Sequence, residues 1–241
     1  MKKELTWIDL GLISYEEAFI VQEQLHERCV DGSWPDTLLF QENHPIITLG
    51  RGTHEKNLLL TPVELLDLGI ALTAVSRGGD ISYHGNGQFI VSPILHFDQY
   101  VKGAHQYVRC LEQVVINLLA HYQLKGKRIK GRSGVWVTEP GTGEDRKISA
   151  LGIAVSHGVT LHGMSINVNP NLEHFKAIIP CGIEDKGITS LAVCGCPSVT
   201  LPDLRDQFIL AFDEMFGTQT SRRTITELNI DQKHPVVPAH A

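Results

Sequence analysis

Apolar positions along the chain recur with two different periods, one typical of helices and one typical of strands. Spacings of three and four residues predict helices over residues 14–28, 61–68, 104–122 and 201–216. The first begins behind Ser14, a residue type that caps helices, and carries acidic side chains in its first turn. The second has a proline in its first turn, where an N–H group would lack a helical partner anyway. Four amphipathic helices are therefore expected.

Short runs rich in β-branched and aromatic residues predict strands between these helices. They cover residues 37–41, 45–49, 71–76, 88–97, 134–138, 147–155 and 159–168. The last two lie on either side of a turn at residues 156–158 and alternate apolar with other positions, so they predict an antiparallel hairpin. A second hairpin loop is expected at residues 139–146, which are rich in glycine and acidic residues. Strands interleaved with helices and hairpins favour an α/β (α+β) fold built on a mixed β-sheet flanked by helices.

The composition is that of an ordinary globular domain. Its 241 residues, 42% of them hydrophobic and 20% charged, can bury a sufficient core without disulfides or metal ions. The chain contains no internal repeat and no linker rich in Pro, Gly or Ser. We therefore expect a single domain over residues 1–241, with a small C-terminal lobe from about residue 180 and a frayed tail at residues 231–241.

Charge and cysteine content exclude several classes of protein. The net charge of −6 disfavours nucleic-acid binding, which needs a basic surface. The amino terminus lacks an apolar run of secretory length, and no uncharged stretch has the composition of a membrane span. Five cysteines without framework spacing favour reduced thiols, so we expect a cytoplasmic protein with no membrane or nucleic-acid partner. The histidines show no HExxH or zinc-finger spacing, so no metal site is expected.

A glycine-rich segment, RGGDISYHGNGQ at residues 77–88, is the first candidate for ligand binding. Its four glycines let the backbone turn sharply and approach a ligand, and Arg77, Tyr83 and His84 supply groups suited to recognition. The segment contains neither GxGxxG nor GxxxxGK[ST], so it gives little support to nucleotide binding. The alternative is a glycine-rich loop without a ligand.

Two further side chains could take part in chemistry. Cys181 stands between a proline and a glycine, and such a rigid turn presents a thiol better than the helical surroundings of Cys29 and Cys110. Lys147 begins an apolar strand, where it is either a solvated end residue or a desolvated amine whose pKa falls toward neutrality. His162 fits a hydrogen-bonded pocket or core position, and we assign it no role in proton transfer.

Five motifs together resemble the octanoyltransferases of lipoate synthesis. In chain order they are RGGDISYHGNGQ (77–88), RSGVWV (132–137), KISALGI (147–153), HGMSINV (162–168) and PCGI (180–183). They follow the order of that family and, with their surroundings, span roughly residues 35–195. The resemblance implies the fold shared by lipoate and biotin protein ligases, a mixed sheet flanked by helices with a smaller second sheet beside it.

The resemblance also implies roles for particular residues. Cys181 would be the acyl-accepting nucleophile and Lys147 the residue that activates it. The substrate pocket would be formed by Arg77, Gly78, Gly79, Asp80, Ile81, Ser82, Tyr83, His84, Ala150, Leu151, Gly152, Gly163, Met164 and Ser165. The chain departs from the family pattern at Ser82, Asn86, Ser92 and the pair 164–165, which affects the pocket but neither Cys181 nor Lys147.

The implied reaction moves an octanoyl group from octanoyl-acyl carrier protein to a lysine of lipoyl domains. The implied acceptors are the lipoyl domains of 2-oxoacid dehydrogenase complexes and the glycine cleavage H protein. A thioester is already activated, so acyl transfer needs a nucleophile, a base and an oxyanion site but no cofactor. An acidic carrier would need basic side chains at its docking site, and such a cluster, which could equally be a solvated loop, is formed by Lys125, Lys127, Arg128, Lys130 and Arg132.

Three alternatives stay open at the level of sequence. An ATP-dependent lipoate or biotin ligase would have the same fold but would form an acyl adenylate and need no nucleophilic cysteine. A non-catalytic module would bind acyl groups or lipoyl domains without gaining a covalent acyl group. A cysteine hydrolase would pair Cys181 with a histidine such as His84 and release free octanoate.

Overall fold

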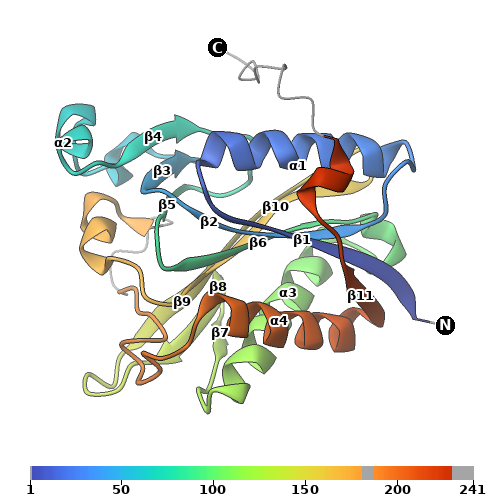
Figure 1. The fold of residues 1–241 in the computed structure, drawn as a ribbon. Helices are drawn as coiled ribbons and strands as arrows, with labels where there is room; N and C mark the ends of the chain where they lie inside the picture. The colour runs from blue at the N-terminus through green and yellow to red at the C-terminus, as the bar shows by residue number, and fades with distance from the viewer. Residues whose placement is uncertain (1, 181–186, 230–241) are drawn as a thin grey trace.

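The computed structural model describes residues 2–180 and 187–229, which form two sheets with helices on both sides (Figure 1). Within these residues the main sheet has the strand order β11-β1-β2-β6-β10-β9-β8-β7. The strands are β1 (Lys3–Ile13), β2 (Thr37–Asn43), β6 (Gln88–Ile94), β7 (Lys127–Ile129), β8 (Arg132–Thr138), β9 (Asp145–Ser156), β10 (Val159–Asn167) and β11 (Thr218–Arg222). Strand β1 runs parallel to β2 and β11, and the other neighbours are antiparallel, so the sheet is mixed.

A smaller sheet of three strands lies beside the main one. Strand β3 (Ile46–Leu49) is its centre, with β4 (Ala71–Ala74) parallel and β5 (Ile81–His84) antiparallel to it. The short helix α2 (Pro62–Asp67) precedes β4 at this end of the molecule (Figure 1). This arrangement confirms the expected mixed sheet with a smaller second sheet, and it shows that part of the glycine-rich segment is itself a strand.

Helices cover the two faces of the main sheet separately. Helix α1 (Tyr15–Val30) lies on one face, and α3 (Ala104–His121) and α4 (Leu201–Phe216) lie together on the other (Figure 1). Alternation along β2 explains this division, because Leu38 and Phe40 are buried with α3 and α4 whereas Leu39 is buried with α1. Both cores therefore use consecutive residues of one central strand.

The helices predicted from spacing agree with the structure to within two residues at each end. Helix α1 begins with a capping box in which Ser14 Oγ accepts from the Glu17 N–H group at 3.2 Å, and Glu17 Oε2 accepts from the Ser14 N–H group at 3.3 Å. Caps of this kind stabilise a helix by about 1 kcal/mol. Because the signal is local, the sequence alone could locate it.

Three strands of the main sheet have no counterpart among the sequence predictions. Strand β7 has only three residues and β11 is mostly polar. In β1 the pairing with β2 shifts between Asp9 and Leu12, next to Gly11 at φ +64°, so apolar alternation breaks down along the strand. Strands β1 and β11 depend on distant partners more than on their own pattern, whereas β7 pairs with the adjacent β8 but is too short to give a pattern.

The end of the described chain belongs to the main body of the protein. Helix α4 packs on α3 with Phe208 and Phe212 fully buried, and β11 pairs with β1. Within residues 187–229, these elements contribute to the main core and the main sheet. The tail predicted at residues 231–241 lies outside the described residues. No helix in the described ranges is long and apolar enough to cross a membrane.

Candidate active site

A cavity of about 230 Å³ opens where the middle of the main sheet meets the glycine-rich segment and the start of α1. Of the residues implied by the resemblance, it is lined by Arg77, Gly79, Asp80, Ser82, His84, Ala150, Leu151, Gly152, Gly163, Met164 and Ser165. Ile81 and Tyr83 line a second, smaller cavity, and Gly78 lines neither. The structure thus brings together in one place three sequence segments that lie far apart in the chain.

The hairpin of β9 and β10 explains how two of these segments meet. In its register Ala150, Leu151 and Gly152 lie directly opposite residues 165, 164 and 163, respectively. Gly163 is required by close packing, because a Cβ atom there would lie 2.0 Å from the carbonyl oxygen of Val91 in β6. The cavity wall is therefore built from cross-strand neighbours in a tightly packed part of the sheet.

Arg77 holds the glycine-rich segment in shape. Its buried guanidinium donates to the carbonyl oxygen of Asp80 at 2.7 Å and to both the carbonyl oxygen and Oγ1 of Thr48, at 2.9 and 2.8 Å. These bonds join the segment to strand β3. Arg77 lines the cavity, but its hydrogen bonds to protein oxygens show that it also positions the wall.

Another side of the cavity is formed by the rings of Tyr15, His84 and His162, which come from α1, β5 and β10. Tyr15 stacks on His84 with ring centroids 6.4 Å apart, and Phe19 stacks on His162 at 5.4 Å. Burial, reinforced by the positive charge of Arg77, lowers the pKa of His84 to about 3 and that of His162 to about 4. Both rings are therefore neutral near pH 7, and this wall suits an uncharged ligand group.

His162 has an unusual backbone for a strand residue. Its φ is +58°, a region that non-glycine residues seldom adopt, and its Nε2 lies 3.1 Å from Ser76 Oγ. The sequence predicts a pocket or core position for His162 without a role in proton transfer, and the structure places this residue in the cavity wall. Ser92, named above as a departure from the family pattern that affects the pocket, also lines the cavity. Other lining residues that the sequence did not indicate are Tyr15, Gln22, Gln41, Asn43, Ile90 and Ser133. For Tyr15 and Gln22 the available signal was their place on the predicted helix at residues 14–28.

Lys147 lines the smaller cavity, which adjoins the first. The two cavities share Ser82, Ala150 and Ser165. Lys147 is only 3% exposed, and its Nζ lies 5.0 Å from the centroid of the Trp136 ring. A solvated strand end is therefore excluded, and the amine is buried next to the cavity system.

The described residues on either side of residues 181–186 lie close to Lys147. Cys181 itself lies outside the described residues. Pro180, just before it, lines the same small cavity as Lys147, and the carbonyl oxygen of Gly187 accepts from the Lys147 N–H group at 3.0 Å. Strand β10 pairs with β9 only as far as Ser149, and beyond that point residues 187–189 take its place beside β9.

Buried amides connect this segment to the sheet. Asn167 donates through Nδ2 to the carbonyl oxygen of Thr189 at 2.9 Å, and its Oδ1 accepts from Gln88 Nε2 at 2.8 Å. The Thr189 N–H group in turn donates to the carbonyl oxygen of Lys147 at 3.0 Å. Sequence reasoning missed Asn167, since its partners lie far away along the chain.

The other cysteines are poorly placed for nucleophilic chemistry. The described cysteines are Cys29, Cys110, Cys194 and Cys196, and none of them lines either cavity. Burial raises the pKa of the first three thiols, which disfavours the thiolate form.

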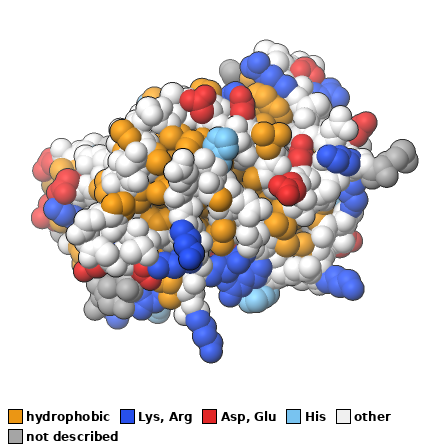
Figure 2. All heavy atoms as spheres, turned by 90° about the horizontal axis from the view of Figure 1, so that it is seen from below, with side chains coloured by type: hydrophobic (Ala, Val, Ile, Leu, Met, Phe, Trp, Pro, Cys, Tyr) orange, Lys and Arg blue, Asp and Glu red, His pale blue; other side chains and the backbone are white. Residues whose placement is uncertain are grey.

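The basic residues after α3 are only partly available to a partner. Arg128 is bound to the buried carboxylate of Glu112, with Nε 2.9 Å from Oε2, and Lys127 pairs with Asp145. Lys125 and Lys130 are exposed. Figure 2 shows the side of the molecule seen from below, where Lys and Arg side chains lie among exposed hydrophobic ones.

Comparison with known proteins identifies the family. The family of the lipoyl protein ligase A/B catalytic domain matches residues 14–213, a range that includes all of the residues lining both cavities. The chain is 38% identical over 232 residues to an octanoyltransferase of Thermosynechococcus vestitus, covering 95% of this chain and 98% of that one. The chain belongs to the octanoyltransferase family. It is therefore an enzyme of the acyltransferase class.

Other relatives agree with this assignment. Identity to an octanoyltransferase of Chloroflexus aggregans is 39% over 215 residues, covering 89% of this chain and 96% of that one. An octanoyltransferase of Porphyromonas gingivalis is 43% identical over 196 residues, and the chain spans 79% of its own length but 40% of that longer protein.

Solved structures of lipoate ligases share the fold. A lipoate protein ligase of T. acidophilum with bound lipoic acid superposes with a TM-score of 0.69 at 16% identity, covering 95% of this chain and 91% of that one. A lipoate-protein ligase A bound with ATP gives 0.68 at 16% identity, with the same coverage. The fold expected from the motifs is confirmed.

Proposed function

We propose that this chain transfers an octanoyl group from octanoyl-acyl carrier protein to a lysine of lipoyl domains, through a thioester on Cys181. The observation that carries the proposal is the position of buried Lys147. It lines the same small cavity as Pro180, and its main-chain N–H group donates a hydrogen bond to the carbonyl oxygen of Gly187. These residues flank the segment that contains Cys181. The names of the relatives support octanoyl as the transferred group.

In the first step the thiol of Cys181 gives its proton to the amine of Lys147. The thiolate attacks the carbonyl carbon of the octanoyl thioester, and the carbon–sulfur bond to the carrier's phosphopantetheine breaks. The departing thiolate takes up the proton from Lys147. General acid–base assistance of this kind accelerates a reaction by about 10²–10⁴.

In the second step the lysine amine of the acceptor domain attacks the carbonyl carbon of the acyl-enzyme. Lys147 accepts a proton from that amine, an amide bond forms, and the thiolate of Cys181 leaves and is reprotonated by Lys147. Octanoyl amide and free enzyme result, with no net consumption of protons.

The larger cavity provides a place for the octanoyl chain. It adjoins the cavity of Lys147 through Ser82, Ala150 and Ser165. Its wall contains Met164 and two histidines that are neutral near pH 7. An acyl chain carries no charge, so this wall can accept it without burying an unpaired ion.

The acceptors proposed are the lipoyl domains of 2-oxoacid dehydrogenase complexes and the glycine cleavage H protein. Exposed Lys125 and Lys130 are proposed to contact the acidic carrier protein. The reaction is proposed to take place in the cytoplasm, where thiols such as Cys181 stay reduced.

Intact-mass spectrometry of the protein mixed with octanoyl-acyl carrier protein, without ATP, tests the proposal. The wild type should gain one octanoyl group that hydroxylamine removes, Cys181→Ser should gain no hydroxylamine-sensitive group, and Lys147→Ala should gain it more slowly. Cys110→Ser serves as the matched control and should behave as the wild type. Transfer only from free octanoate with ATP, without any adduct on the wild type, would establish the ligase mechanism instead.

A further inference from the structure

A second cluster of reactive side chains lies at the end of the sheet away from the cavities. Cys29 is in the last turn of α1, Asp36 immediately precedes β2, and His96 follows β6 by two residues. The cavity lies at the other end of β2, where it is lined by Gln41 and Asn43. The cluster is therefore separate from the candidate active site.

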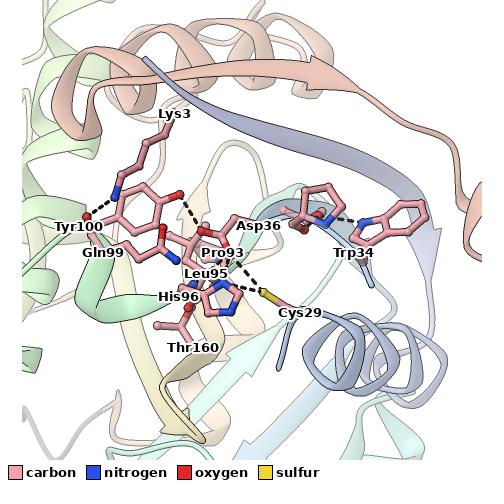
Figure 3. A network of polar contacts seen from close by, with 12 residues as sticks. Lys3, Cys29, Trp34, Asp36, Pro93, Leu95, His96, Gln99, Tyr100 and Thr160 are labelled. Atoms are coloured by element: carbon pink, nitrogen blue, oxygen red, sulfur yellow. Dashed lines mark hydrogen bonds and ion pairs between the residues drawn. The ribbon is translucent and has the colours of Figure 1, made fainter. Parts of the chain in front are cut away.

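The three side chains converge on one point (Figure 3). Cys29 Sγ lies 3.2 Å from Asp36 Oδ1 and 3.4 Å from His96 Nδ1, and these two atoms are 2.7 Å apart. Cys29 and Asp36 are 1% and 8% exposed, while the side chain of His96 is 32% exposed. One sulfur, one oxygen and one nitrogen thus face each other, and His96 is the most exposed of the three side chains.

We propose that Cys29, Asp36 and His96 bind a zinc-like divalent cation as a structural metal site. A tetrahedral ion at 2.0–2.3 Å from such ligands would hold them about 3.3–3.6 Å apart. Both distances from the sulfur are close to this range, and only the Asp36–His96 pair must separate by about 0.6 Å. A mixed sulfur, nitrogen and oxygen donor set suits zinc, whereas calcium and magnesium prefer oxygen alone.

The proton balance of binding follows from the hydrogen bonds. The thiol of Cys29 donates to Asp36, and burial together with that carboxylate raises its thiol pKa. The cation takes the place of this proton, which is released to solvent. His96 must present the lone pair of Nδ1, so the neutral ring carries its single proton on Nε2. A neutral ring protonated at Nδ1 moves that proton to Nε2 without net release, whereas an imidazolium would lose one proton.

Neighbouring groups already orient the carboxylate. The hydroxyl of Tyr100 donates to Asp36 Oδ2 at 2.6 Å, and the His96 N–H group donates to Oδ1 at 3.0 Å. Such support around a metal ligand commonly fixes its orientation. The fourth position would be filled by water from the exposed side of His96, and the ion would join the end of α1 to strands β2 and β6.

Cobalt(II) titration of chelator-treated, reduced protein tests this site. One equivalent should produce a thiolate-to-cobalt charge-transfer band and the visible bands of a tetrahedral ion, and zinc(II) should displace it. Cys29→Ser and His96→Gln should each weaken cobalt binding about 100-fold or more, and Tyr100→Phe about 10-fold. Cys110→Ser should bind as the wild type.

A variant that keeps its fold separates loss of metal binding from loss of structure. His96 is partly exposed, so His96→Gln should keep the native circular dichroism spectrum even where Cys29→Ser unfolds. Retention of the charge-transfer band and of wild-type affinity in His96→Gln would overturn the proposal by locating the metal elsewhere. Absence of the band in the wild type would show that the cluster is only a hydrogen-bond network.

Discussion

The main-chain N–H group of Lys147 donates a 3.0 Å hydrogen bond to the carbonyl oxygen of Gly187, a residue forty positions later in the chain. The Thr189 N–H group donates a hydrogen bond of the same length to the carbonyl oxygen of Lys147. The proposed general base is thus fixed by its backbone to the segment that follows Cys181. Changes that loosen this attachment should slow catalysis without touching either reactive group.

Asn167→Asp should lower the turnover number for octanoyl transfer. The substitution keeps the acceptor for Gln88 but removes the donor to the carbonyl oxygen of Thr189. Displacement of a catalytic group by about 1 Å can cost about 100-fold, so we expect a 10- to 100-fold lower kcat with little change in KM for the carrier. Steady-state kinetics measures kcat and KM separately, with Asn117→Asp on α3 as the control. An equal loss in both variants would contradict a positioning role for Asn167.

Gly163→Ala should destabilise the protein and narrow the cavity. The new methyl group would lie 2.0 Å from the Val91 carbonyl oxygen and 2.8 Å from Pro93 Cδ, so the sheet must shift. Overpacking of this kind costs about 1–3 kcal/mol. Gly158→Ala, in the turn of the same hairpin, places its methyl group in open space at φ +78° and meets only backbone strain. Urea unfolding of both variants should show the larger loss for Gly163→Ala, and the reverse order would refute the packing explanation.

His162 should make the protein less stable in acid. Its pKa is lowered from 6.5 to about 4 by burial and then by Arg77, so the unfolded chain binds one more proton between these values. The contribution of His162 to the free energy of unfolding is therefore present in full above about pH 6.5. As the pH falls below that value, the free energy of unfolding decreases by up to about 1.4 kcal/mol per pH unit for one proton.

His162→Asn should reduce that acid dependence. Asparagine tolerates the left-handed backbone at φ +58° but does not titrate. The slope of unfolding free energy between pH 6 and pH 4.5 should fall by about 1.4 kcal/mol per pH unit relative to wild type. His157→Asn, at φ +51° on the exposed turn of the hairpin, is the matched control and should keep the wild-type slope.

Charge reversal at Lys125 and Lys130 should weaken binding of the octanoyl-acyl carrier protein. Both side chains are exposed, whereas Arg128 is unsuitable for this test because it holds the buried Glu112 carboxylate. We expect a rise of about threefold to tenfold in KM for octanoyl carrier at low salt, and a smaller difference at high salt. Lys102→Glu, before the other end of α3, is the control. Unchanged KM and salt dependence would rule out docking at these two lysines.

The sequence alone determined those features that are encoded over a few residues. The capping box of Ser14 and Glu17 specifies the start of α1, and apolar spacing specifies the other long helices. Alternation on either side of residues 156–158 specifies the β9–β10 hairpin, which sets residues 150–152 opposite residues 163–165. The motifs themselves were sufficient to indicate the family and the fold.

Only the tertiary structure decided which distant residues meet. The burial of Lys147 beside residues 187–189, the binding of Arg77 to Thr48, and the convergence of Cys29 with Asp36 and His96 leave no periodic signal in the chain. Strand β11 likewise exists because β1 offers it a parallel edge. Most of these contacts join positions tens of residues apart, so their energy depends on how the two sheets and their helices pack, which no local spacing encodes.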